Sequence, residues 1–206
     1  MTHATRPQRR SNRLVTLQSL ILKIFLIGSL GLLLGHVSGG AAPAAASISC
    51  TLVEKEGKVE VSRKGSTAWN VAQLNDTYQP GDRIRTGSRS RAALRWSELS
   101  VVRLSELTSM EIQPPAKPGD KPQLDLRSGA SYFFSREKPT EIQFRTPVAS
   151  GAIRGTEFDL QVAEDGRTVL SLLDGEVDLS NAQGPASLRS GEQATVEPGG
   201  APKKPR

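Results

Sequence analysis

The chain has 206 residues, of which 27 are Lys or Arg and 21 are Asp or Glu, and its formal net charge is +6. Five of the basic residues and no acidic residue fall within residues 1–46, which leaves 22 basic and 21 acidic side chains for the rest. Because a nucleic-acid-binding protein needs a basic face on its folded part, this distribution excludes a nucleic-acid partner.

Residues 1–46 have the pattern of an export signal helix. A basic stretch ends at Arg13, an uninterrupted apolar run covers residues 24–34, and three alanines allow cleavage after Ala46. Residues 14–37 are also long enough to span a bilayer, so the alternative is an uncleaved signal anchor. Both alternatives predict a periplasmic or otherwise exported protein, anchored in the inner membrane if the signal stays. We expect membrane contact through this segment alone.

The residue types available after residue 46 exclude most catalytic chemistry. Both histidines, His3 and His36, precede that point, and Cys50 is the only cysteine. Ser-His-Asp and Cys-His catalysis, His-containing zinc sites and an intrachain disulfide are therefore excluded. The paired carboxylates Glu157 with Asp159 and Glu176 with Asp178 remain for glycoside hydrolysis, but on an alternating strand they are typical of a solvated face. We expect a protein that is not an enzyme, with no cofactor and no metal.

Apolar residues alternate with polar ones almost throughout residues 52–196, and no window shows a helical period. The alternation predicts an all-β domain of about 10 to 13 short antiparallel strands. Four segments of the form strand, Gly, strand recur without a fixed spacing, at Gly57, Gly129, Gly175 and Gly191. They suggest stacked hairpins or corners, so we expect a sandwich- or solenoid-like fold.

Composition divides the chain after the signal. Residues 47–197 form one predicted domain, in which the Pro-rich stretch 113–123 cannot pair as a central strand and joins the halves 52–112 and 124–197 as a loop. Residues 198–206 are rich in Pro, Gly and Lys, which predicts a disordered tail.

Several segments, taken in order, resemble the FecR domain of bacterial envelope proteins. They are GDRIRTGSRSRAALRW (81–96), SVVRLSELTSMEI (100–112), LDLRSGASYFF (124–134), FRTPVASGAIRGTEFDLQV (144–162) and LSLLDGEVDLSN (170–181). The most specific family motif, T-P-x-A followed by G-x-R-G-T-x-F, matches at Thr146, Pro147, Ala149, Gly151, Arg154, Gly155, Thr156 and Phe158. The resemblance covers roughly residues 53–197.

The resemblance implies a role in signalling at the cell envelope. The best-known members regulate iron uptake: a cytoplasmic segment acts on a sigma factor, and a periplasmic FecR domain receives a signal from an outer-membrane siderophore transporter. Here only roughly 13–20 residues precede the apolar run, so we expect a stand-alone exported module. The expected function is non-enzymatic binding of an envelope protein, for sensing or scaffolding. The alternative is a structural or adhesive envelope component without a signalling role.

The motif residues, together with Glu157, have two interpretations. Gly151 and Gly155 permit a sharp return between strands, and Arg154 is expected to reach Glu157, Asp174 or Glu176. This favours a structural corner; a partner-binding surface or an anion site is the alternative.

Aromatic residues supply the other candidates. Trp96 is in phase with the core positions, whereas Trp69 is expected to be half exposed, where it could contact a partner. Of Tyr132, Phe133 and Phe134, at least one must point away from the core because neighbours on a strand alternate between faces.

Overall fold

A computed structural model describes residues 50–96, 99–113, 123–136 and 140–205. These residues lie in one compact unit, residues 45–206. The predicted signal lies outside the described residues. The part of the chain that the structure describes contains no helix long and apolar enough to cross a membrane.

The described residues contain fourteen strands and no helix, so the prediction of an all-β fold is confirmed and the predicted number of strands was too low. The strands are β1 (Cys50–Glu56), β2 (Val59–Ser62), β3 (Asn70–Val71), β4 (Thr77–Tyr78), β5 (Arg83–Thr86), β6 (Arg91–Arg95), β7 (Ser100–Leu104), β8 (Ser109–Gln113), β9 (Gln123–Ser135), β10 (Thr140–Arg145), β11 (Ser150–Val162), β12 (Thr168–Asn181), β13 (Gly184–Arg189) and β14 (Gln193–Val196). All pairs are antiparallel except β9 with β10, which are parallel.

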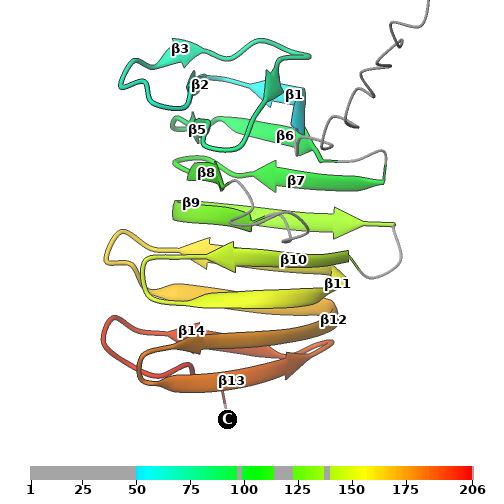
Figure 1. The fold of residues 1–206 in the computed structure, drawn as a ribbon, viewed down its shortest axis with the longest axis vertical. Helices are drawn as coiled ribbons and strands as arrows, with labels where there is room; N and C mark the ends of the chain where they lie inside the picture. Colours follow the sequence, from blue (N-terminus) through cyan, green and yellow to red (C-terminus); the bar gives the residue numbers. More distant parts are fainter. Residues whose placement is uncertain (1–49, 97–98, 114–122, 137–139, 206) are drawn as a thin grey trace, which may run out of the picture. The chain divides into compact units, whose positions relative to one another are not determined.

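The strands form two layers of one continuous sheet, stacked from β3 at one end to β13 at the other (Figure 1). Layer 1 runs β3-β2-β5-β8-β9-β10-β11-β12-β13, and layer 2 runs β4-β1-β6-β7-β9-β11-β12-β14. The long strands β9, β11 and β12 belong to both layers, because each half pairs with different neighbours.

The glycines of the recurring sequence pattern lie where the chain passes between the layers. Gly129 and Gly175 lie inside β9 and β12, whereas Gly57 and Gly191 connect β1 to β2 and β13 to β14. All four have positive φ, between 70° and 124°, a conformation that favours glycine. The alternation of buried side chains changes phase at these points. In β9, for example, buried side chains before Gly129 include the even-numbered Leu126, and those after it include the odd-numbered Phe133. These corners let one strand contribute side chains to the core from both layers.

The two layers enclose one hydrophobic core to which both predicted halves contribute, since β7 and β8 pair with β9. Residues 114–122 of the predicted Pro-rich loop lie outside the described residues. Trp96 packs against the core but is only partly buried.

The prediction of a disordered tail was wrong for the segment before Arg206. The backbones of Thr195 and Lys203 exchange two hydrogen bonds, of 2.8 and 2.9 Å, and Pro202 is buried. Asn181 donates a hydrogen bond of 2.7 Å to the carbonyl oxygen of Gly200. The tail is ordered because it satisfies backbone groups along β14, which has an open edge.

Cys50 begins β1 with a buried side chain. Burial, together with the negative charge of Asp82, raises the pKa of its thiol to about 12. We expect the folded protein to resist alkylation at pH 8 and to react fully in urea.

Because the folded pKa of Cys50 exceeds the reference value of 9.0, the free energy of unfolding should fall as pH rises from 9 toward 12. Denaturation at several pH values, with Cys50→Ala as the control, measures this loss of stability. Rapid alkylation of the folded protein would contradict the burial of the thiol.

Candidate functional site

The motif begins in the tight turn between β10 and β11. Thr146 is buried, and its hydroxyl accepts hydrogen bonds from the Ala149 amide (3.1 Å) and from the Thr168 hydroxyl (2.9 Å). The Thr146 amide donates to the Ala149 carbonyl at 2.8 Å, which closes the turn, and Pro147 lies exposed at its tip. These contacts make Thr146 part of a hydrogen-bonded corner.

Two motif glycines lie where no side chain fits. A Cβ on Gly151 would come within 2.6 Å of the Phe144 ring and 2.7 Å of the Asp178 carbonyl oxygen. Gly155 pairs directly with Gly175, and a Cβ there would meet the Asp174 carbonyl oxygen and approach the Gly175 Cα to 2.9 Å. Gly155 and Gly175 therefore allow the backbones of β11 and β12 to approach closely where both strands change layers.

Arg154 does not form an ion pair with any of the carboxylates that the sequence suggested. Its side chain is 65% exposed on the outer face of layer 1, and the nearest carboxylate is Glu141, at 3.9 Å. Glu176 lies opposite it on β12, whereas Glu157 belongs to the part of β11 in layer 2. The expected pairing with Glu157 fails because the strand changes layers between the two residues.

The remaining motif residues follow the crossing. The Thr156 hydroxyl donates a hydrogen bond to Asp174. Phe158 is fully buried and stacks on Phe133, with ring centroids 5.1 Å apart. Glu157 accepts a hydrogen bond from the Tyr132 hydroxyl, and this bond, more than burial, raises the pKa of Tyr132. Glu157 thereby links the motif to the outer face of layer 2.

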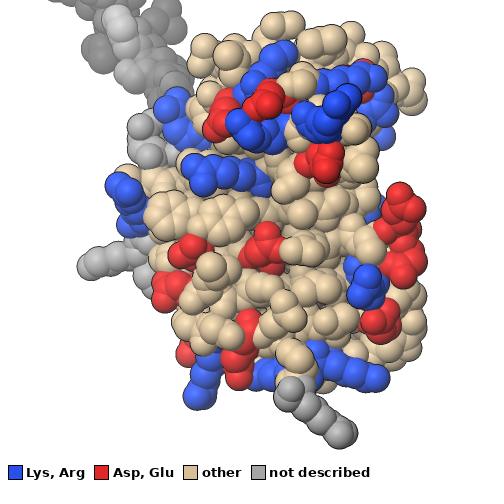
Figure 2. Space-filling view, turned by 180° about the vertical axis from the view of Figure 1, so that it is seen from behind, with Lys and Arg blue, Asp and Glu red and all other residues tan. Residues whose placement is uncertain are grey.

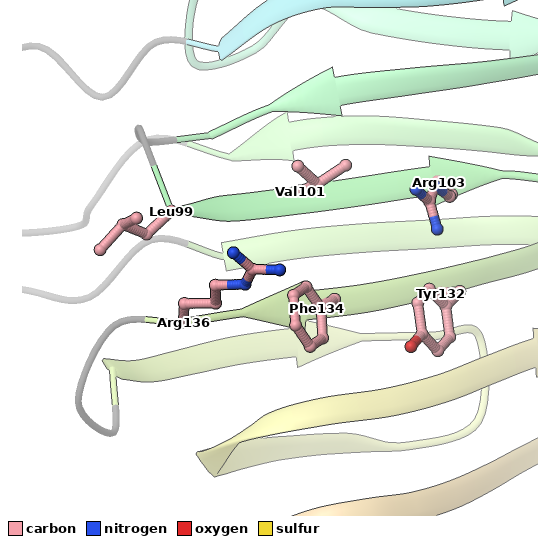
Figure 3. A pocket seen from close by; sticks show the side chains of 6 residues that line it. All are labelled: Leu99, Val101, Arg103, Tyr132, Phe134 and Arg136. Atoms are coloured by element: carbon pink, nitrogen blue, oxygen red, sulfur yellow. The ribbon is translucent and has the colours of Figure 1, made fainter.

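That outer face carries a shallow hollow of about 270 Å³ over β7 and β9 (Figure 3). Its lining residues alternate along the two strands: Leu99, Val101, Arg103, Tyr132, Phe134 and Arg136. Val101 lies opposite Phe134, and Arg103 lies opposite Tyr132. The guanidinium of Arg136 lies 5.9 Å from the centre of the Phe134 ring. Partly exposed aromatic residues beside arginines are the composition typical of protein interfaces.

The strands on either side of the hollow differ in charge. On one side, β6 contributes the basic Arg95, which lies opposite Val101. On the other side, β11 contributes the acidic Glu157 and Asp159, which lie opposite Phe134 and Tyr132. Figure 2 views this side of the domain, opposite to that of Figure 1. Basic side chains gather near the end that carries β1, and uncharged side chains cover much of the middle.

Sequence reasoning identified only part of this surface. It required one aromatic among residues 132–134 to face outward, but it did not identify Leu99, Val101, Arg103 or Arg136. The alternation in SVVRL marks Val101 and Arg103 as one face of a strand, yet only the pairing of β7 with β9 brings them beside Tyr132 and Phe134.

Trp69 is half buried just before β3, as expected. The Arg85 guanidinium lies 4.1 Å and that of Arg83 5.3 Å from the centre of its ring. Arg85 also binds Glu60 at 2.8 Å. Cation–π contacts within the chain thus cover part of Trp69, which leaves less of the ring for a partner.

The described residues contain no group of three or more His, Cys, Asp or Glu side chains that could hold a metal ion. The carboxylates considered for hydrolysis are spread over two surfaces. Glu176 and Asp178 line a mixed-charge hollow on layer 1 with Arg154 and Arg189, whereas Glu157 and Asp159 lie on layer 2.

Residues 82–178 match the model of a protein family described as FecR protein. Two crystal structures of a candidate anti-sigma factor from Parabacteroides distasonis are similar at 22% and 21% identity, each with a TM-score of 0.49. Each match covers 60% of this chain and 59% of the length of that one. No curated protein matches the chain significantly. The motif and the hollow both lie inside the matched residues, and Trp69 lies outside them.

Proposed function

We propose that this chain, whose residues 82–178 form a FecR domain, is an exported, non-enzymatic module that binds another envelope protein and so takes part in envelope signalling. The observation that carries the proposal is the hollow on layer 2, which leaves aromatic and apolar side chains exposed between arginines. The family supports a signalling role, and the pattern of residues 1–46 supports a periplasmic or otherwise exported location.

The proposed contact is made by side chains outside the core. Val101, Tyr132 and Phe134 are only partly buried, although the opposite faces of their strands carry the fully buried Val102 and Phe133. Aromatic and arginine side chains contribute most of the binding energy in many protein interfaces. Trp69 is a second proposed contact, on a different part of the domain.

Crosslinking in intact cells tests the proposal. The tagged full-length protein is compared with Phe134→Ala and Trp69→Ala, and the mass of the recovered protein shows whether the signal is cleaved. We expect one discrete partner protein, lost in Phe134→Ala. Recovery of only homo-oligomers or wall-bound material would overturn the proposal and favour a structural or adhesive component. A partner lost only in Trp69→Ala would keep the proposed function but move the contact away from the hollow.

A further inference from the structure

The hollow on layer 2 has a cation at each end and apolar groups between them. Arg103 lies opposite Tyr132, while the Arg136 amide bonds to the Leu99 carbonyl oxygen at 2.9 Å. Arg136 directly follows the end of β9 and lies four residues after Tyr132, which corresponds to about 13 Å along an extended chain. Val101 and Phe134 fill the space between the two ends (Figure 3).

Neither of these arginines has a carboxylate within 4.0 Å in the part of the chain that the structure describes. Some other arginines on the domain are paired, namely Arg63 with Asp82 at 2.9 Å, Arg85 with Glu60 at 2.8 Å and Arg127 with Asp125 at 3.0 Å. The hollow therefore combines an apolar floor with two arginines that no described carboxylate pairs with directly, although Glu157 and Asp159 lie on the neighbouring strand β11.

The geometry points to an extended acidic segment of the partner protein as the occupant of this hollow. Its carboxylates lie four residues apart and bind Arg103 and Arg136, and an apolar side chain midway between them rests on Val101 and Phe134. An extended chain advances about 3.3 Å per residue, so this spacing matches the two arginines. This inference names the partner chemistry for the proposed function and depends on it.

Charge decides between this occupant and the chain's own N-terminal segment. Residues 1–46 carry five basic and no acidic side chains, so they would place like charges beside the arginines. A carboxylate, in contrast, accepts two hydrogen bonds from one guanidinium, which fixes its position as well as its charge.

Fluorescence anisotropy with synthetic peptides tests the inference on the protein purified from the cell envelope. The probe is a labelled, capped peptide containing Glu-Ser-Leu-Ser-Glu, and the matched probe has Lys in place of both Glu. The test variant is Arg103→Glu with Arg136→Glu. The control variant, Arg154→Glu with Arg189→Glu, makes the same charge change in the hollow on layer 1.

We expect the acidic peptide to bind the wild type and the control variant, and to bind the test variant at least about tenfold more weakly. The test variant should instead prefer the lysine peptide, a reversal that loss of structure alone would not produce. Equal binding of both peptides by the wild type, no binding of either, or an equal loss in the control variant would overturn the inference.

Two other occupants are separate outcomes that would also overturn it. Self-association that is abolished by Phe134→Ser, seen by analytical ultracentrifugation, would make a second copy the occupant. Arginine-dependent binding to phosphatidylglycerol vesicles without peptide binding would make a membrane surface the occupant.

If the crosslinked partner is retained by the test variant, the proposed function stands and this inference fails. If the acidic peptide binds but cells yield no partner, the proposed function fails instead.

Discussion

Replacing Gly155 by alanine should lower the free energy of unfolding by about 3 kcal/mol. The new Cβ would meet the Asp174 carbonyl oxygen and lie 2.9 Å from the Gly175 Cα. Both are backbone atoms of a paired strand, so no side-chain rotation can relieve the overlap. The two strands must separate where both change layers, and urea denaturation followed by circular dichroism would measure the loss.

Gly200→Ala is the matched control, because the nearest atoms to a Cβ there, in Glu197, lie at 3.4 Å and beyond, and its φ is not positive. We expect a change of less than about 0.5 kcal/mol for this variant. A Gly155→Ala protein as stable as the control would show that the crossing has room for a side chain.

The regular part of the fold could be predicted from the sequence. Alternation at positions such as Ile142 and Phe144, or Val177 and Leu179, identifies strands and their buried faces, and burial in the structure agrees. The recurring glycines also indicated corners. What alternation cannot show is that Gly129 and Gly175 bend single long strands, because a corner inside a strand and a turn between two strands both appear as a break in phase.

The candidate site was harder to predict, because it depends on which strands become neighbours. Glu157 and Arg154 seemed close because three positions separate them in the sequence, yet the layer change places them on different surfaces. Arg103 and Tyr132 are far apart in the sequence but lie opposite each other. Local spacing is a guide to contacts within a turn, as at Thr146 and Ala149, and not to contacts across a sheet.

The tail shows a different limit. Its composition is that of a disordered segment, and composition judges only how much apolar surface a segment can bury. Its order instead depends on backbone hydrogen bonds between Lys203 and Thr195, which any residue other than proline can make. An open strand edge is a property of the assembled sheet and cannot be recognised in the tail's own residues.

Phe158→Ala should destabilise the domain by about 4 kcal/mol, because the Phe158 ring is fully buried and stacks on Phe133 at 5.1 Å. Phe134→Ala, which removes an equal ring from the outer face of layer 2, should cost about 1 kcal/mol or less. Phe158→Leu, at a smaller cost, keeps the comparison measurable if the alanine variant does not fold. Urea denaturation of the three variants measures the loss in the free energy of unfolding for each.

Equal losses at the two phenylalanines would mean that Phe134 is a core residue and that the hollow is not a free surface. A large difference would establish Phe134 as a side chain that the fold does not require, and so as a clean probe of partner binding.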